Sequence, residues 1–342
     1  MIKVLFTDSH FGVKQNSITW LNSQLDFIYD ELIPAIDKLR QRDNVKLIHL
    51  GDVFDSRSTL STIVASRLVD AFKELRRHVD QFIIIGGNHD YYSPTTDDVN
   101  SLNLILHNSD IRLITNTLDI DEVYDPQAGS DLYVPWYEWL DQEKLKKYIA
   151  NFNEHCIVHE PIKNIYTHAD IVNEYVDPFF DDFNIYSGHV HTPDIKKGRY
   201  NLGSCYALTF TDANEERGFY VDDGTLHFVP NKKSIRFWRL YNDDIFDDDK
   251  VNAMKSGDYM EIYVNQTNLI LDRYTKKLDA LAKKFPKNRW VIPQIETVIS
   301  DDSIDTFTGY DIEATCRKHV MVHPELEDKF NAIINALTTK PE

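Results

Sequence analysis

Five short segments of the chain each place a metal-binding side chain directly after a run of apolar residues. In open α/β sheets the carboxyl ends of the strands face a common crevice, so side chains that are distant in the sequence can meet there. We therefore expect these segments to converge on one site that holds two metal ions. The segments are Asp8-Ser9-His10, Gly51-Asp52, Gly87-Asn88-His89-Asp90, His159 and Gly188-His189-Val190-His191.

The residue types indicate which metals such a site would bind. Imidazole and carboxylate groups suit first-row cations such as manganese, iron or zinc, whereas an oxygen-only set favours magnesium or calcium. His189 and His191 are two residues apart, and in extended backbone this spacing puts both rings on one face, within reach of neighbouring metals. Asp52 is the natural bridging ligand between the two ions.

One ligand position is open to more than one histidine. His155 and His168 lie near His159, but His159 alone directly follows an apolar triplet, so we assign the position to His159. The remaining histidines lie outside the motifs and are interpreted as structural or surface groups: His49, His78, His107, His227, His319 and His323.

The elements that position these residues can be predicted from the hydrophobic pattern. Apolar runs at 2–7 and 45–50 indicate strands, and between them leucine and isoleucine recur at helical spacing. The same alternation predicts a helix over 61–77 and a strand over 82–85. Further strands are expected at 111–114, 131–134, 155–158 and 183–187, followed by short β segments up to about residue 240. The result is an α/β layered domain that is richer in strands toward its end.

The acidic run at 243–250 is the clearest change in composition, and it is interpreted as a linker or as an acidic surface turn. After it, strands are expected over 258–265 and 290–299, with a helix between them whose apolar stripe runs from Leu271 to Phe285. These elements form a small β-α-β module. Basic residues between 273 and 289 mostly avoid the apolar stripe and form either a phosphate-contacting face or a solvated one.

The last predicted element is a helix that begins near Pro324, because proline and the acids beside it suit a first helical turn. Its apolar face would dock on this chain or on a partner.

The bulk composition excludes several classes of protein for this chain. A chain of 342 residues with 42% hydrophobic content can bury a large core. A net charge of −18 argues against coating nucleic acid by charge alone, so any DNA contact must be local or metal-mediated. Cys156, Cys205 and Cys316 form neither a disulfide framework nor a thiolate metal site. No apolar run spans a membrane and no leader precedes the first strand, so we expect a soluble cytoplasmic protein.

The motifs DSHFG, GDVFD, GNHD and GHVH are similar to the signature of calcineurin-like metallophosphoesterases. More narrowly, the chain resembles the SbcD type of DNA-repair nuclease subunit, in which D-x-H-x-G and GD-x-FD occur. Phe11, Ser56 and Asp90 depart from the pattern of the related protein phosphatases. The resemblance covers residues 1–240, although Cys205 and Tyr206 stand where that family usually has proline and a small apolar residue.

The resemblance implies a fold and a division into domains. Residues 1–240 would form the nuclease domain, a β-sandwich flanked by helices. Residues 241–302 would form a small α+β capping domain that could contact DNA, and residues 303–342 a tail with a helix that could bind an ATPase.

The resemblance also implies roles for individual residues. Two divalent ions, expected to be manganese, would share Asp52, and His89 would be the catalytic histidine that protonates the leaving 3′-oxygen, with Asp90 orienting its ring. Independently of the resemblance, the position of Asp55 and Arg57 just past Asp52 suits residues that orient metal ligands or shape the groove, and the alternative is a plain helix-capping or surface role. One ion would be held by Asp8, His10, Asp52 and His191, and the other by Asp52, Asn88, His159 and His189.

The implied activity is that of a DNA exonuclease and endonuclease in recombination, repair or replication. It would act as a homodimer within a heterotetramer, through helices near 61–77 and 98–107, with a separate SMC-like ATPase of the SbcC type. The chain itself has no Walker loop. The alternative is a stand-alone metallophosphoesterase that acts on nucleotides or small phosphodiesters, which would need neither the appended module nor the basic helix.

Overall fold

A computed structural model describes residues 1–93, 95–121, 129–156, 160–265, 272–285 and 289–294. Residues 1–295 form one compact unit. The whole tail over 303–342, with the C-terminal helix expected near Pro324, lies outside the described residues, as does the second half of the strand expected over 290–299.

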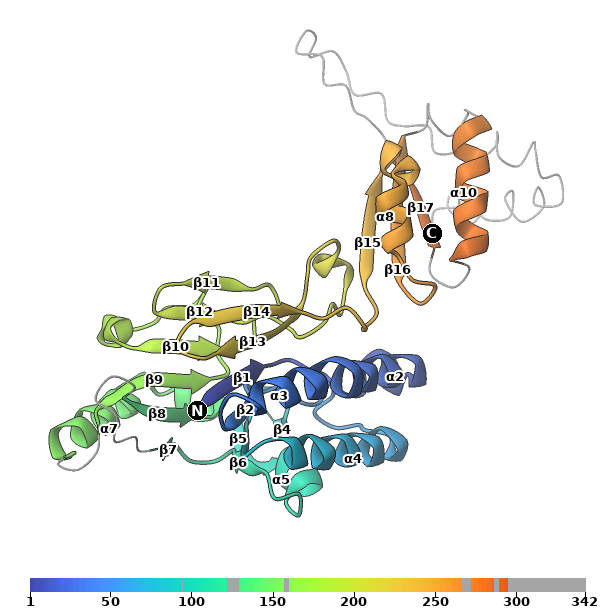
Figure 1. Ribbon diagram of the computed structural model, residues 1–342. Helices are drawn as coiled ribbons and strands as arrows, with labels where there is room; N and C mark the ends of the chain where they lie inside the picture. Colours follow the sequence, from blue (N-terminus) through green and yellow to red (C-terminus); the bar gives the residue numbers. More distant parts are fainter. Residues whose placement is uncertain (94, 122–128, 157–159, 266–271, 286–288, 295–342) are drawn as a thin grey trace, which may run out of the picture. The chain divides into compact units, whose positions relative to one another are not determined.

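Two six-stranded sheets form the body of the larger part of this unit (Figure 1). In the first, with the order β14-β13-β1-β2-β3-β6, four neighbouring strands run parallel and β13 and β14 are antiparallel. Its strands are β1 (Ile2–Phe6), β2 (Val45–His49), β3 (Gln81–Ile85), β6 (Arg112–Ile114), β13 (Gly218–Asp222) and β14 (Leu226–Pro230).

The second sheet has the order β11-β12-β10-β9-β8-β7, with β8, β9, β10 and β12 parallel. Its strands are β7 (Asp119–Asp121), β8 (Ser130–Val134), β9 (Ile162–Thr167), β10 (Asn184–Ser187), β11 (Asp194–Lys196) and β12 (Arg199–Asn201). A separate hairpin joins β4 (Tyr91–Ser93) and β5 (Thr96–Asn100).

Helices cover the outer face of each sheet (Figure 1), as the apolar stripes of the sequence predict. The segment 18–40 is continuous and includes a π-helical turn, η1. Against the first sheet lie α2 (Ile18–Phe27), η1 (Ile28–Leu32), α3 (Ile33–Arg40), α4 (Thr62–His78) and α5 (Ser101–Leu106), and on the second-sheet side are α6 (Trp136–Trp139) and α7 (Gln142–His155). The short elements are the left-handed turn α1 (Val13–Asn16), η2 (Pro178–Asp182) and η3 (Phe210–Asp212).

Alternation along the strands divides the core into layers. Val4 and Phe6 of β1 pack against the helices, whereas Leu5 faces the other sheet. In the same way Tyr133 of β8 faces the first sheet, while its neighbours Leu132 and Val134 face away from it. This two-residue period is the expected property of strands buried on both faces, and it produces the layered α/β sandwich expected from the sequence.

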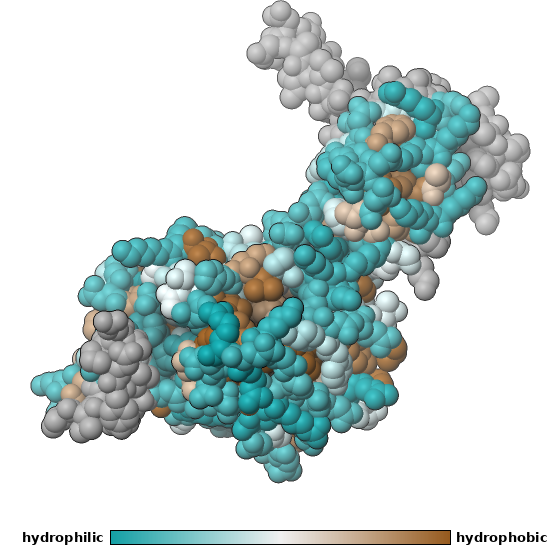
Figure 2. All heavy atoms as spheres, viewed as in Figure 1, coloured by the Kyte–Doolittle hydropathy of each residue, from teal (hydrophilic) through white to brown (hydrophobic). Residues whose placement is uncertain are grey.

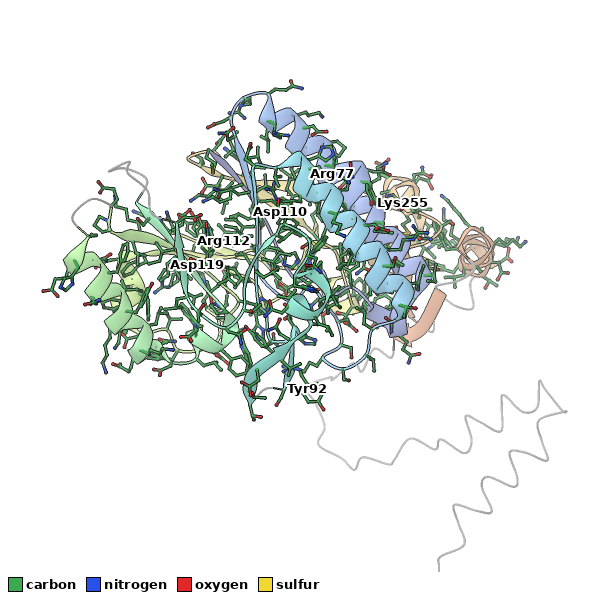
Figure 3. All side chains as sticks on the ribbon, turned by 90° about the horizontal axis from the view of Figure 1, so that it is seen from below. Arg77, Tyr92, Asp110, Arg112, Asp119 and Lys255 are labelled. Atoms are coloured by element: carbon green, nitrogen blue, oxygen red, sulfur yellow. The ribbon has the colours of Figure 1, made fainter. Side chains whose placement is uncertain are left out.

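Charged groups are buried at one place between the sheets. The Lys46 ammonium lies 2.6 Å from a carboxylate oxygen of Asp121 and 3.5 Å from one of Asp131, and Lys3 lies 2.8 Å from Asp131. Arg112 extends the network at the surface, where it bonds to Asp119 (Figure 3). Each buried charge is therefore paired, as a low-dielectric interior requires.

The smaller module begins at Phe237, earlier than the acidic run that we interpreted as a linker. Its parallel sheet has the order β15-β16-β17, and Asp247 caps α8 by accepting a hydrogen bond from the amide of Lys250. The acids of 243–250 thus cap and begin helices. The elements are β15 (Phe237–Tyr241), η4 (Asn242–Phe246), α8 (Asp248–Ala253), β16 (Tyr259–Asn265), α10 (Asp272–Lys284) and β17 (Arg289–Gln294).

The helix α10 packs through the apolar stripe predicted for it. Tyr274, Leu278 and Leu281 are buried in the core of the module. On its other side Lys276 and Lys277 pair with the carboxylates of Asp272 and Asp248. Part of the basic face is therefore neutralised within the module.

The predicted strand over 155–158 is not formed as expected. His155 is the last residue of α7, Cys156 lies in no strand, and residues 157–159 are outside the described part. The strand that the chain forms here is β9, which begins at Ile162, four residues after the end of the predicted strand.

The face drawn in Figure 2 is mostly hydrophilic, with hydrophobic residues in small groups. Among the described residues, we find no helix with the length and apolar character needed to span a membrane.

Candidate metal centre

The predicted ligand segments follow strands of both sheets. Asp8 and His10 come after β1, Asp52 after β2, Asn88 after β3, and His189 and His191 after β10. The strands β1, β2 and β3 are parallel neighbours, so their following loops share one edge of the first sheet. Contacts across the sandwich bring the loop after β10 to the same place, since the amide of His189 donates to a carboxylate oxygen of Asp8 at 3.1 Å.

The first group of ligand atoms comprises Asp8, His10, Asp52 and His191. Nε2 of His10 lies 3.2 Å from Nε2 of His191 and 3.8 Å from carboxylate oxygens of both Asp8 and Asp52. Nε2 of His191 lies 3.7 Å from Oδ1 of Asp8. Two ligands that each sit about 2.1 Å from one ion are separated by about 3.0–3.4 Å, so the two imidazoles have the spacing of a shared metal.

The second group comprises Asp52, Asn88, His189 and His168. Oδ1 of Asn88 lies 3.0 Å from Nδ1 of His189 and 3.1 Å from Nε2 of His168. Nε2 of His168 lies 3.3 Å from Oδ1 of Asp52. These separations also match ligands around one cation.

Asp52 belongs to both groups through different oxygens. Its Oδ2 is the atom near His10, and its Oδ1 is the atom near His168. Oδ1 also accepts a hydrogen bond from the amide of His89 at 2.8 Å, which fixes the carboxylate between the two groups. The arrangement suits a bridging carboxylate.

His168 was an open alternative in the sequence, and our assignment of the position to His159 was based on the apolar triplet before it. His159 lies outside the described residues. His168 directly follows β9 and is fully buried, with Nδ1 2.7 Å from the carbonyl oxygen of Leu50. The signal that could have found it is the same one used for the other ligands, a histidine at the end of a strand.

Several ligands adopt left-handed backbone conformations, which side chains other than glycine rarely take. The φ angles of Asp8, His10, Asp52 and His189 are 51°, 39°, 54° and 79°. The expectation that His189 and His191 share a face of an extended segment is therefore wrong, because a left-handed residue turns the chain between them. Such strain is retained where the surrounding structure enforces it, commonly at functional sites.

Two glycines allow the ligand loops to approach each other. A Cβ atom on Gly188 would lie 2.0 Å from Oγ1 of Thr7, and one on Gly87 would lie 2.2 Å from the backbone nitrogen of Asp52. No side chain fits at either position, so the glycines of GNHD and GHVH are required by the close contact of the loops.

The electrostatics of the centre favour ionised carboxylates. Burial raises the pKa of Asp8, but the nearby imidazoles of His10, His168 and His191 outweigh it and bring the pKa well below the usual range. The pKa of Asp52 is also lowered, with His168 as the main opposing influence to burial. Burial lowers the pKa values of His189 and His191, which favours the neutral rings that bind metals.

The donor set fits a pair of divalent cations. Oδ1 of Asp8 is buried and has no hydrogen-bond partner within the described structure, although it points at the two imidazoles of its group. A buried carboxylate oxygen without a partner is costly, and a cation would satisfy it. Groups of Asp and His with ligand atoms within 4.8 Å of one another include Asp8 with His10 and His191, and Asp8 with Asp52 and His168.

His89 extends toward the first group from the turn that also carries Asn88. Its ring lies 5.1 Å from that of His10, and its Nδ1 is 2.6 Å from the backbone carbonyl oxygen of Asp55. Because a carbonyl only accepts, Nδ1 carries the proton, and Nε2 is the atom left for a substrate.

Asp90 does not hold the ring of His89 as we expected. Its carboxylate accepts hydrogen bonds from the backbone amides of Phe54 and Gly87, at 3.2 and 2.9 Å. It therefore ties the turn of His89 to the loop after Asp52, and the ring is oriented by the Asp55 carbonyl. Burial, and then the charge of Asp52, raise the pKa of Asp90 to about 7.

Two buried residues outside the motifs support the ligand loops. His49 lies 2.8 Å from the hydroxyl of Ser9 and accepts from the amide of Gly51 through Nδ1, and burial lowers its pKa to about 3. Gln24 of α2 donates to the backbone carbonyls of Ser9 and His10. His49 was interpreted as structural, and these contacts agree with that role.

Comparison with known proteins places this centre among phosphoesterases. The model of the family described as calcineurin-like phosphoesterase matches residues 4–193, which include every ligand of both groups. "Exonuclease subunit 1" of Enterobacteria phage T4 is 21% identical over 338 residues, covering 94% of this chain and 92% of that protein. "DNA double-strand break repair protein Mre11" of Methanococcus maripaludis is 24% identical over 210 residues, covering 56% of this chain and 52% of that protein.

Among solved structures, the nuclease MPE of Pseudomonas putida is similar over 60% of this chain and 70% of its own, with 16% identity and a TM-score of 0.27.

Proposed function

Because the chain belongs to the calcineurin-like phosphoesterase family, we propose that it is a metal-dependent DNA nuclease with exonuclease and endonuclease activity. The resemblance seen in the motifs is thus confirmed at the level of the family. The single observation that carries the proposal is the pair of ligand groups that share Asp52, with its two oxygens directed at different groups. The named relatives support DNA as the substrate.

We assign the first cation to Asp8, His10, Asp52 and His191, and the second to Asp52, Asn88, His168 and His189. The mixture of imidazole, carboxylate and amide donors favours manganese among the common divalent ions. When bound, a pair of such ions supplies Lewis acidity and an activated water for in-line attack on phosphorus.

His89 is the proposed catalytic histidine. Its Nδ1–H is committed to the carbonyl of Asp55, which leaves Nε2 for the substrate. In the imidazolium form of the ring, Nε2–H can deliver its proton to the departing 3′-oxygen and the neutral ring remains. Asp90 acts as a positioning residue, because its two backbone hydrogen bonds hold the turn from which His89 extends.

The proposed partners are DNA, an SMC-like ATPase of the SbcC type and a second copy of this chain within a heterotetramer. The printed name of the phage relative describes it as a subunit, which supports an assembly. Exposed apolar side chains on α4, α5 and the β4–β5 hairpin favour these elements for dimerisation; they include Ile63, Tyr92 (Figure 3), Val99 and Leu104. The module from Phe237 onward is proposed as the capping domain, and residues 303–342 as the segment that binds the ATPase.

A nuclease assay on linear and hairpin DNA tests the proposal, first with manganese and then with magnesium. We expect cleavage with manganese and weaker cleavage with magnesium. If the purified chain hydrolysed a nitrophenyl phosphodiester yet never DNA, even with its ATPase present, a stand-alone phosphoesterase for small substrates would be the better description.

A further inference from the structure

We propose that Arg57 is a phosphate-binding residue that contacts the backbone phosphate next to the one being cleaved. The inference rests on the proposed function, since it requires a strand with more than one phosphate. Nη1 of Arg57 is buried and has no hydrogen-bond partner in the described structure. Its guanidinium carbon lies over the Trp136 ring, 5.9 Å from the ring centre, which is within the range of a cation–π contact.

Several other half-buried arginines, such as Arg112 and Arg239, form ion pairs with carboxylates. Arg112 bonds to Asp119 at 2.7 Å, and Arg239 bonds to Glu261 at 2.8 Å. For Arg57, by contrast, no carboxylate among the described residues lies within ion-pairing distance. An arginine with a purely structural role would be expected to have such a partner, because a desolvated cation is costly when it is unpaired.

Arg57 and Trp136 are both tied to the turn that carries His89. The carbonyl of Asp55, two residues before Arg57, holds the His89 ring, and the amide of Trp136 donates to the carbonyl of Gly86 at 3.0 Å. Arg57 and Trp136 therefore belong to segments that contact the two sides of the His89 turn, and neither is one of the seven ligand residues. This placement suits a contact with the neighbouring phosphate rather than with the reacting one.

The chemistry of the pair also fits this ligand. A guanidinium presents a rigid fork of N–H donors that matches phosphate oxygens, and contact with the indole ring restricts its rotamers before the ligand arrives. The chain carries a net charge of −18, so a polyanionic strand needs a local cation near the centre. Arg57 supplies that cation.

The test uses the full-length protein and a fluorescent DNA oligonucleotide, with calcium in place of manganese so that the strand is not cut. We expect Arg57→Gln to weaken binding about tenfold and to reduce the slope of log K against log salt by about one. Arg57→Lys should recover part of the affinity, since it keeps the charge without the fork. Arg42→Gln is the matched control, because Arg42 is exposed and pairs with Asp223; it should bind within about twofold of the wild type.

Hydrolysis of bis(p-nitrophenyl) phosphate with manganese is the second readout. This diester has a single phosphate, so Arg57→Gln should hydrolyse it as the wild type does. Wild-type DNA binding by Arg57→Gln, or an equal loss of activity on the small diester, would overturn the inference. A wild-type protein that binds DNA but cleaves neither substrate would refute the proposed nuclease, while the binding series would still decide the role of Arg57.

Discussion

Nε2 of His168 lies 3.3 Å from Oδ1 of Asp52, although the two residues follow strands of different sheets. The contact spans the sandwich and joins the loop after β9 to the loop after β2. Burial lowers the pKa of His168, but Asp52 and then Asp8 more than compensate and raise it to about 9. Without a metal this imidazole is therefore an ion-pair partner of Asp52, and a cation would replace its proton.

His168→Ala should remove one ligand of the second cation. We expect the manganese content to fall from two ions per chain toward one, and the phosphodiesterase rate to fall by about a hundredfold or more. Metal analysis after dialysis, together with single-turnover kinetics, measures both effects. His159→Ala is the control, and we expect it to keep two ions and nearly full activity. If His159→Ala lost an ion and His168→Ala kept both, the ligand position of the second cation would belong to His159.

His89→Gln should lower kcat by about 10² to 10⁴-fold and leave the metal content unchanged, because Nδ1 of the ring is committed to the carbonyl of Asp55 and the ring contributes a proton rather than a coordination bond. Calorimetric titration with manganese and the rate on DNA separate the two properties. His107→Gln, at an exposed position, is the control. A variant that lost a metal along with its activity would assign His89 to the coordination sphere.

The types of ligand and most of their positions could be predicted from the sequence, because each motif combines an apolar strand with a polar residue at its end. His168 was harder to predict, because β9 has the sequence IKNIYT and its polar residues interrupt the apolar run. The triplet before His159 begins at Cys156, which directly follows the end of α7 and lies in no strand.

Features that depend on tertiary contact could not be predicted. Whether Asp90 meets a ring or two backbone amides depends on how the loop after Asp52 packs against the GNHD turn. The left-handed backbone of Asp8 and His189 depends on the other sheet in the same way. The acidic run at 243–250 has the composition of a linker, and its capping role depends on the helix that follows it.

Binding of metal should stabilise the fold, because the two groups hold buried carboxylates close together. At a free manganese concentration of 100 times Kd, each site contributes about 2.7 kcal/mol. We expect the unfolding temperature to rise with manganese and to fall with a chelator. Asp8→Asn should reduce this difference, whereas Asp110→Asn, with a carboxylate that is 83% exposed, should keep it. Equal stability with and without the chelator would contradict a tightly bound pair.

The last prediction concerns pH and is independent of the metals. His78, at the end of α4, lies 2.7 Å from Asp37 of α3 and 3.3 Å from Glu74. The hydrogen bond to Asp37, followed by that to Glu74, raises the pKa of His78 above its usual value of 6.5. A histidine whose pKa is raised in the folded protein stabilises the fold. This contribution is fully present below about pH 6.5, and it is lost as the pH rises through the pKa that the histidine has in the folded state.

His78→Gln should therefore be less stable than the wild type near pH 5.5, and the difference should shrink at about pH 8.5. Because Asp37 is 50% exposed, we expect a difference below about 1 kcal/mol. Urea unfolding at the two pH values, with a chelator present throughout, measures the difference in unfolding free energy between the variant and the wild type. His107→Gln is the control. A difference that grew with pH would mean that the neutral ring, rather than the ion pair, stabilises the contact between α3 and α4.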